Sequence, residues 1–136
     1  MSIPVELDVL EAKTAEYGVA YLLTVTDSST PKIVALRPTW DGDEMVAHAG
    51  GGSVRNIAQR AAVTFAYPPL DPDGHTLIVD GEASVDGDVA TSHHIRFRPT
   101  GAVLHRAAPD GFVNTTTGCS HDCAPVTTPT ATAPTD

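Results

Sequence analysis

Residues 76–85 read Thr-Leu-Ile-Val-Asp-Gly-Glu-Ala-Ser-Val, a clean alternation of apolar or small residues with mostly polar ones. Successive side chains of a β-strand point to opposite faces, so the alternation predicts a long strand buried on one side. The buried face would carry Leu77, Val79, Gly81, Ala83 and Val85. The opposite face would carry Thr76, Asp80, Glu82 and Ser84, together with Ile78.

Five further strands and two helices are predicted around this strand. The strands cover residues 18–25, 32–40, 44–48, 63–67 and 95–106, the last one bent near Pro99. The helices cover residues 4–17 and a segment that begins after an N-cap at Ser53. Asp41-Gly42 is a hairpin signal, so we expect the first three strands to form an antiparallel meander. The order predicts a mainly β fold, a six-stranded antiparallel barrel with accessory helices.

Composition limits the possible partners. Eight Lys and Arg face seventeen Asp and Glu in 136 residues, which argues against binding to nucleic acid or anionic membranes. No targeting segment or apolar run of membrane-spanning length is visible, so a cytoplasmic location is expected. We expect one domain over residues 1–109, followed by a flexible C-terminal tail over 110–136.

The most distinctive segment is Gly50-Gly-Gly-Ser-Val-Arg-Asn56, immediately before a predicted helix. Glycines let a backbone approach a ligand closely, and a helix start presents free N–H groups and a positive dipole end. With Arg55 in the first turn, the segment is typical of a phosphate-binding site. The alternative is a flexible loop with Arg55 in solvent.

Several other residues leave two interpretations open. His48 could line a groove or be a half-exposed strand residue, and Trp40 could stack on a ligand or pack at a barrel end. His93 and His94 fit a loop pair better than a metal pair. Cys119-Ser-His-Asp-Cys123 could supply three zinc ligands, form a local disulfide or act as a redox-sensitive tail, but no fourth ligand is present and no metal site is predicted.

The order of segments resembles the pyridoxamine 5'-phosphate oxidase family. The matching segments are Tyr21-Leu-Leu-Thr-Val, Pro31-Lys-Ile-Val-Ala-Leu-Arg-Pro-Thr-Trp-Asp-Gly-Asp, the glycine loop with Arg55-Asn-Ile, Thr76-Leu-Ile-Val-Asp-Gly-Glu-Ala-Ser-Val and Thr100-Gly-Ala-Val-Leu-His-Arg. The resemblance implies a split-barrel homodimer that binds FMN, or the deazaflavin F420, in a groove at the dimer interface.

The resemblance also implies a set of cofactor-binding residues. The flavin ring would face the backbone of the second strand, and the ribityl and phosphate groups would lie near the third strand and the helix start. The residues implied are Val34, Ala35, Leu36, Arg37, Pro38, His48, Ala49, Ser53, Val54, Arg55, Asn56 and Thr76. Relatives commonly carry cations where this chain has Ser53 and Val54, so Arg55 is the one cation expected in the loop.

The function implied is that of an FMN- or F420-dependent oxidoreductase acting on a small organic substrate. The alternative is a non-catalytic protein that binds, sequesters or senses a flavin-like or haem-like ligand, or holds no cofactor. A pyridoxamine phosphate oxidase proper is not expected, because we expect a flexible tail where those enzymes carry a C-terminal substrate-binding segment. No catalytic residue is nominated, since no acid–base pair stands out in the sequence.

Overall fold

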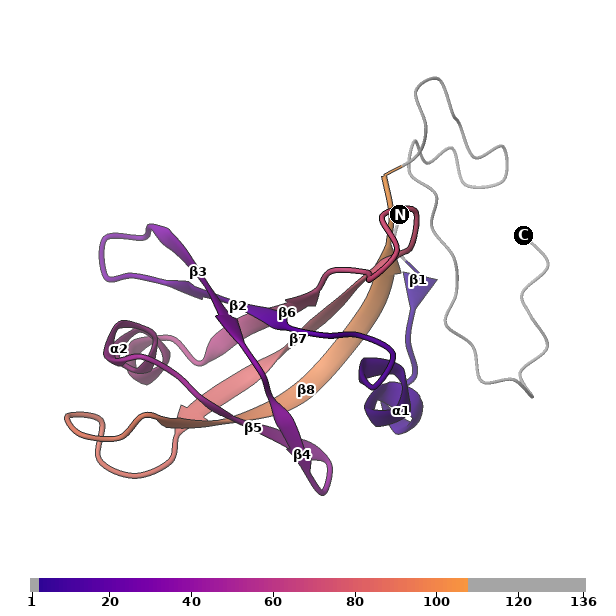
Figure 1. The fold of residues 1–136 in the computed structure, drawn as a ribbon. Helices are drawn as coiled ribbons and strands as arrows, with labels where there is room; N and C mark the ends of the chain where they lie inside the picture. The colour runs from indigo at the N-terminus through magenta and orange to yellow at the C-terminus, as the bar shows by residue number, and fades with distance from the viewer. Residues whose placement is uncertain (1–2, 108–136) are drawn as a thin grey trace.

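The computed structural model describes residues 3–107, which form a curled sheet with two short helices (Figure 1). The strands are β1 (Ile3–Pro4), β2 (Ala20–Val25), β3 (Pro31–Leu36), β4 (Thr39–Asp41), β5 (Glu44–His48), β6 (Ala62–Tyr67), β7 (Thr76–Val85) and β8 (His94–His105). The helices are α1 (Leu10–Thr14) and α2 (Gly51–Gln59). No helix within residues 3–107 is long and apolar enough to cross a membrane.

The sheet is antiparallel throughout, with the strand order β3-β2-β6-β7-β8-β5-β4 and β1 paired to β8. β3 and β4 stand at the two ends of this path, yet only Arg37 and Pro38 separate them along the chain. The sheet must therefore curl so that its two ends meet. The predicted mainly β barrel is confirmed, with eight strands in place of six.

The predicted strand over residues 32–40 breaks in the middle. Its first half, β3, pairs with β2, and its second half, β4, pairs with β5. Proline has no N–H to donate to a ladder, which explains the interruption at Pro38. Both predicted hairpins form, but the meander is wrong as a continuous sheet, because its middle strand passes from one end of the sheet to the other.

Both helix predictions need correction. The helix expected over residues 4–17 is limited to Leu10–Thr14 after a 3-10 turn at Leu7–Val9, because the preceding residues pair with β8 and the Val5 N–H donates to the Ala102 carbonyl at 2.7 Å. The N-cap of α2 is Gly50, which has extended backbone angles, and Ser53 is the third residue of the helix. The two glycines between them are helical, so α2 begins earlier than predicted.

The core fills the inside of the curled sheet. The rings of Phe65 and Phe97 meet edge to face, with centroids 4.9 Å apart. The alternation read from residues 76–85 is confirmed, since Leu77, Val79, Gly81 and Ala83 are all buried. The ladder between β7 and β8 shifts register at Asp80 and Gly81, which places the predicted bend near Pro99 at a β-bulge.

Candidate functional site

The free cations of this acidic chain lie at the two ends of β3, two of them beside α2 and one beside β4. Of the eight Lys and Arg in the sequence, all of which lie within residues 3–107, five bind carboxylates or backbone carbonyls. The three with no such partner in the described residues are Lys32, Arg37 and Arg55. Lys32 lies on β3, Arg37 directly follows it, and Arg55 lies on α2. None of the three forms an ion pair with a carboxylate in the described part of the chain, so each can make a charge-assisted contact with an anionic ligand.

Lys32 and Arg55 converge on the glycines that begin α2. A methyl group built at Gly52 would overlap the Nζ of Lys32, and one built at Gly51 would lie 3.2 Å from an Nη of Arg55. The absence of side chains at these two positions is what makes room for the cations. Lys32, Arg55 and Gly52 border a hollow of about 280 Å³. The other residues that line it are Thr26, Asp27, Asn56 and Gln59.

The start of α2 also presents unused hydrogen-bond donors. In the described part of the chain, the N–H groups of Gly51, Gly52 and Ser53 have no acceptor, and the first bond of the helix runs from the Val54 N–H to the Gly50 carbonyl at 3.0 Å. The Ser53 hydroxyl is buried without a hydrogen-bond partner. Free N–H groups, the positive end of the helix dipole and two cations together fit a phosphate group.

A second hollow of about 600 Å³ lies on the outer surface of β4, β5 and β8. Its edge includes Arg37 and His48, the latter immediately before the residues that lead into α2. Arg96 also lines it but is held by Asp41 at 2.9 Å and Glu44 at 3.1 Å, and these bonds raise the pKa of Arg96. Arg37 is therefore the free cation of this hollow.

Of the twelve residues that the sequence indicated, Arg37 and His48 line the second hollow, and Arg55 and Asn56 line the first. Arg37, His48 and Arg55 are exposed at the site. Val54 lies in the core, and the buried Asn56 amide donates to the Thr24 hydroxyl at 3.0 Å, so neither side chain faces the hollow freely. Val34 and Leu36 face the core, and Ala35 between them faces outward. Pro38 leads into β4, and Ala49 and Ser53 are buried.

Thr76 stands apart from this group. It begins β7, and β2 and β6 lie between β7 and β3 in the sheet. A single chain therefore does not bring Thr76 next to Val34–Pro38.

Lys32 is the site residue that sequence reasoning missed. It alternates with Val34 and Leu36 on the face of β3 that turns toward the core, at the end of the strand nearest α2. A lysine in register with two core-facing residues is a usable signal, because a charged side chain on that face must reach an opening of the barrel.

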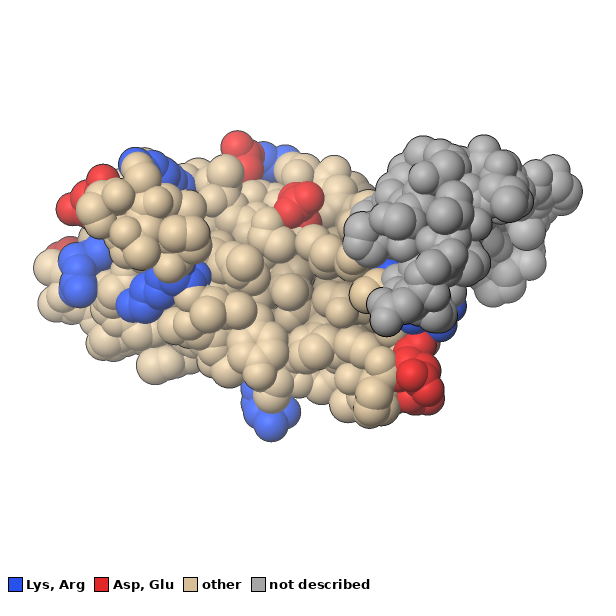
Figure 2. Space-filling view, turned by 90° about the horizontal axis from the view of Figure 1, so that it is seen from above, with Lys and Arg blue, Asp and Glu red and all other residues tan. Residues whose placement is uncertain are grey.

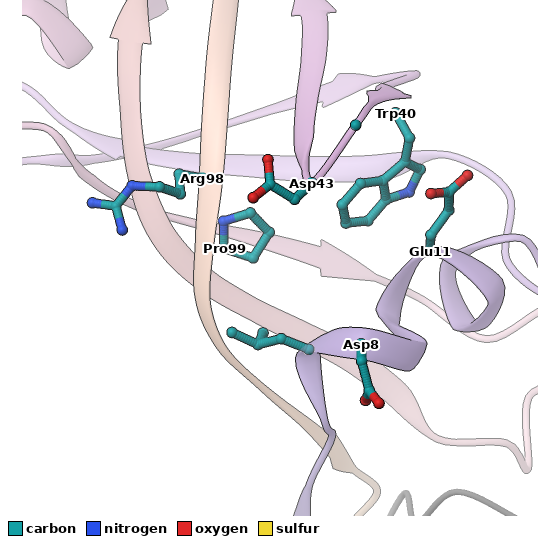
Figure 3. A pocket seen from close by; sticks show the side chains of 8 residues that line it. Asp8, Glu11, Trp40, Asp43, Arg98 and Pro99 are labelled. Atoms are coloured by element: carbon teal, nitrogen blue, oxygen red, sulfur yellow. The ribbon is translucent and has the colours of Figure 1, made fainter.

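A third hollow of about 400 Å³ has the opposite charge (Figure 3). It lies between the N-terminal turn, the β4–β5 hairpin and β8, and Asp8, Glu11 and Asp43 border it beside the Trp40 ring. The Trp40 Nε1 donates to the Thr14 hydroxyl at 2.9 Å, which joins β4 to α1. Arg98 also borders this hollow, but the three carboxylates outnumber it, so an anionic cofactor is better matched by the hollow beside α2.

The histidines of the described residues are not grouped as metal ligands. Among residues 3–107, no group of three or more His, Cys, Asp or Glu is placed to hold a metal ion. The His48 ring instead stacks on His93, with centroids 5.4 Å apart. Cys119 and Cys123 lie outside the described residues.

Two mycobacterial proteins, Mb0449c of Mycobacterium bovis and MT0457 of Mycobacterium tuberculosis, are each 39% identical over 140 residues, covering 92% of this chain and 96% of theirs, and both are described as uncharacterized. No family model matches the chain.

Solved structures share its fold. A Listeria innocua protein provisionally assigned as a pyridoxamine 5'-phosphate oxidase aligns with a TM-score of 0.59 and 16% identity, over 72% of this chain and 96% of its own. The FAD-binding protein of Mycobacterium smegmatis aligns with a TM-score of 0.58 and 19% identity, over 78% of this chain and 100% of its own. An F420 reductase aligns with a TM-score of 0.51 and 22% identity, over 68% of this chain and 94% of its own. At these identities the likeness establishes the fold alone.

Proposed function

Because the chain belongs to the family of the mycobacterial proteins Mb0449c and MT0457 and has the split-barrel fold of pyridoxamine 5'-phosphate oxidase-like proteins, we propose that it binds a flavin-type coenzyme and uses it for redox chemistry. FMN is the first candidate and F420 the second. The substrate would be a small organic molecule.

The observation that carries this proposal is the position of the three free cations. Lys32 and Arg55 meet at the glycines of α2, while Arg37 lies five residues farther along the chain from Lys32, a distance of about 16 Å in an extended strand. This arrangement suits an elongated ligand with a phosphate at one end better than a single small ion. Lys32 also supplies the charge that Ser53 and Val54 do not.

The chain's own residues would bind and orient the coenzyme. Lys32, Arg55 and the N–H groups of Gly51 and Gly52 would hold the phosphate, and the backbone of Val34–Pro38 would direct the ring toward the hollow beside His48. The flavin itself supplies the redox chemistry when bound. The protein's part is to position the ring and to limit the access of water to it.

Titration of the purified protein with FMN, F420 and FAD, followed by fluorescence, tests this proposal. Lys32→Ala and Arg55→Ala should each weaken binding about 10- to 100-fold, as expected for loss of a charge-assisted contact. Arg98→Ala is the matched control, because Arg98 pairs with Glu82 away from the site. Failure of a folded protein to bind any of the three would refute the proposal.

Catalysis is tested separately from binding. The bound coenzyme would be reduced chemically without oxygen, and its reoxidation by a panel of small organic acceptors would be followed by absorbance. Reoxidation accelerated by the protein supports an oxidoreductase. Tight binding without acceleration would favour the alternative, a protein that carries or senses the coenzyme.

We also propose that the chain forms a homodimer through the outer face of the sheet. One row across five strands is entirely apolar and faces away from the core: Ala35, Tyr21, Ala66, Ile78 and Val103. Ile33 and Tyr21 are 60% and 39% exposed. Figure 2 shows a broad face with few charged residues at its centre and most of them near its margins. A continuous row of outward-facing apolar side chains is typical of an association surface.

Light scattering after gel filtration checks the dimer. Tyr21→Glu would place a charge within the row and should give a monomer. Leu70→Glu is the control, because Leu70 is 78% exposed but lies in the loop between β6 and β7. A wild-type monomer, or a Tyr21→Glu dimer as stable as the wild type, would contradict this interface.

A further inference from the structure

His93, just before β8, contacts the residue that leads into α2. The Ala49 N–H donates to the His93 carbonyl at 2.7 Å, and the His93 Nδ1 lies 3.2 Å from the Ala49 carbonyl oxygen. Ala49 is 1% exposed. Residue 93 therefore satisfies both backbone polar groups of a buried residue, one through its own backbone and the other through its ring.

The ring of His93 also contacts a second histidine. It stacks on the His48 ring at 5.4 Å with an angle of 20° between the planes. His48 also meets His94 edge to face at 5.7 Å. A carbonyl oxygen only accepts hydrogen bonds, so the contact with Ala49 requires the Nδ1 of His93 to carry the proton.

We propose that His93 is a positioning residue for the phosphate end of the site. Ala49 directly precedes Gly50, the N-cap of α2, so its position sets where the free N–H groups of Gly51 and Gly52 point. Loss of the Nδ1–H would leave a buried carbonyl without a partner, and Ala49 would shift to find one. This inference rests on the proposed function, because it assumes that α2 begins at a phosphate site.

Three substitutions of the same residue separate the hydrogen bond from the bulk of the ring. The side-chain N–H of His93→Asn can occupy the place of Nδ1, whereas that of His93→Gln lies one bond farther out, and His93→Ala has none. Each variant would be titrated with FMN and F420. Hydrogen exchange of residues 49–54 would be measured without ligand.

We expect His93→Ala and His93→Gln to weaken coenzyme binding about 5- to 10-fold and to speed exchange at residues 49–54, with His93→Asn close to the wild type. Arg98→Ala is the control, since its side chain pairs with Glu82 away from the start of α2, and it should leave both measurements within about twofold.

The outcomes distinguish this inference from the proposed function. A wild type that binds the coenzyme, with a His93→Ala variant that binds equally well, would overturn the positioning role. Loss of binding in His93→Asn as well would overturn the role of the Nδ1–H. If the wild type binds neither coenzyme, the proposed function fails, and the exchange data alone decide whether His93 holds the start of α2.

Discussion

Gly52→Ala should raise the stability of the protein and lower its affinity for the coenzyme. Gly52 is the second residue of α2 and does not have a positive φ, so its backbone suits alanine. Alanine in place of glycine stabilises a helix by about 0.5–1 kcal/mol. The new methyl group would overlap only the Nζ of Lys32, the end of a flexible side chain that can rotate away. The net change in the free energy of unfolding should therefore lie between zero and a gain of about 1 kcal/mol.

Binding should change in the opposite direction. With the methyl group present, Lys32 can no longer lie over the start of α2, and one charge-assisted contact to the phosphate is lost. Such a contact contributes about 1.5–3 kcal/mol, which corresponds to an increase in Kd of roughly 10- to 150-fold. Thermal denaturation and fluorescence titration with FMN and F420 measure the two effects on the same sample.

Gly50→Ala is the matched control, and the double variant Lys32→Ala/Gly52→Ala is the decisive one. A methyl group at Gly50 meets no atom within 4 Å, so this variant should keep its affinity while losing about 0.5–1 kcal/mol at the N-cap. The double variant should bind no more weakly than Lys32→Ala alone, because both changes remove the same contact. Wild-type affinity in Gly52→Ala, or full additivity in the double variant, would refute the reasoning.

Three further predictions concern stability. Gly81→Ala should lower the free energy of unfolding, measured by urea denaturation, by more than about 3 kcal/mol, because its methyl group would overlap the backbone carbonyl of Arg98 in the neighbouring strand. A decrease of less than about 1 kcal/mol would contradict this packing. Burial, reinforced by cations such as Arg106, lowers the pKa of His75, so the unfolded chain binds a proton there before the folded one does. Stability should fall as the pH drops below about 6.5, and His75→Gln should flatten this part of the Tm profile. Burial raises the pKa of Tyr67 to about 12, so stability should fall above about pH 10, less steeply in Tyr67→Phe.

The sequence predicted correctly those elements whose bounds depend on their own residues and not on the neighbouring strands. The strand over residues 76–85 has the bounds that its alternation indicates, since period-two burial on a single face needs no knowledge of the neighbouring strands. The prediction of a helix over residues 4–17 was wrong because the structure of this segment depends on a distant strand. Its thin apolar stripe could not compete with the pairing of Ile3 and Pro4 to β8, residues about 100 positions away in the sequence.

The candidate site divides in the same way. The sequence by itself predicted a helix start with free donors and with Arg55 in its first turn, because capping and dipole effects act within one turn. It placed Gly51 and Gly52 before the helix, whereas they form its first two residues. Only the tertiary structure decided that Lys32 lies over Gly52, that Val54 points into the core and that His93 contacts Ala49. These contacts join segments that are 20 to 44 residues apart, and the closure of the sheet, not the local chain, sets which side chains meet. Periodicity within a segment tells which face is buried, but it carries no information about which distant cation fills the space that a glycine leaves open.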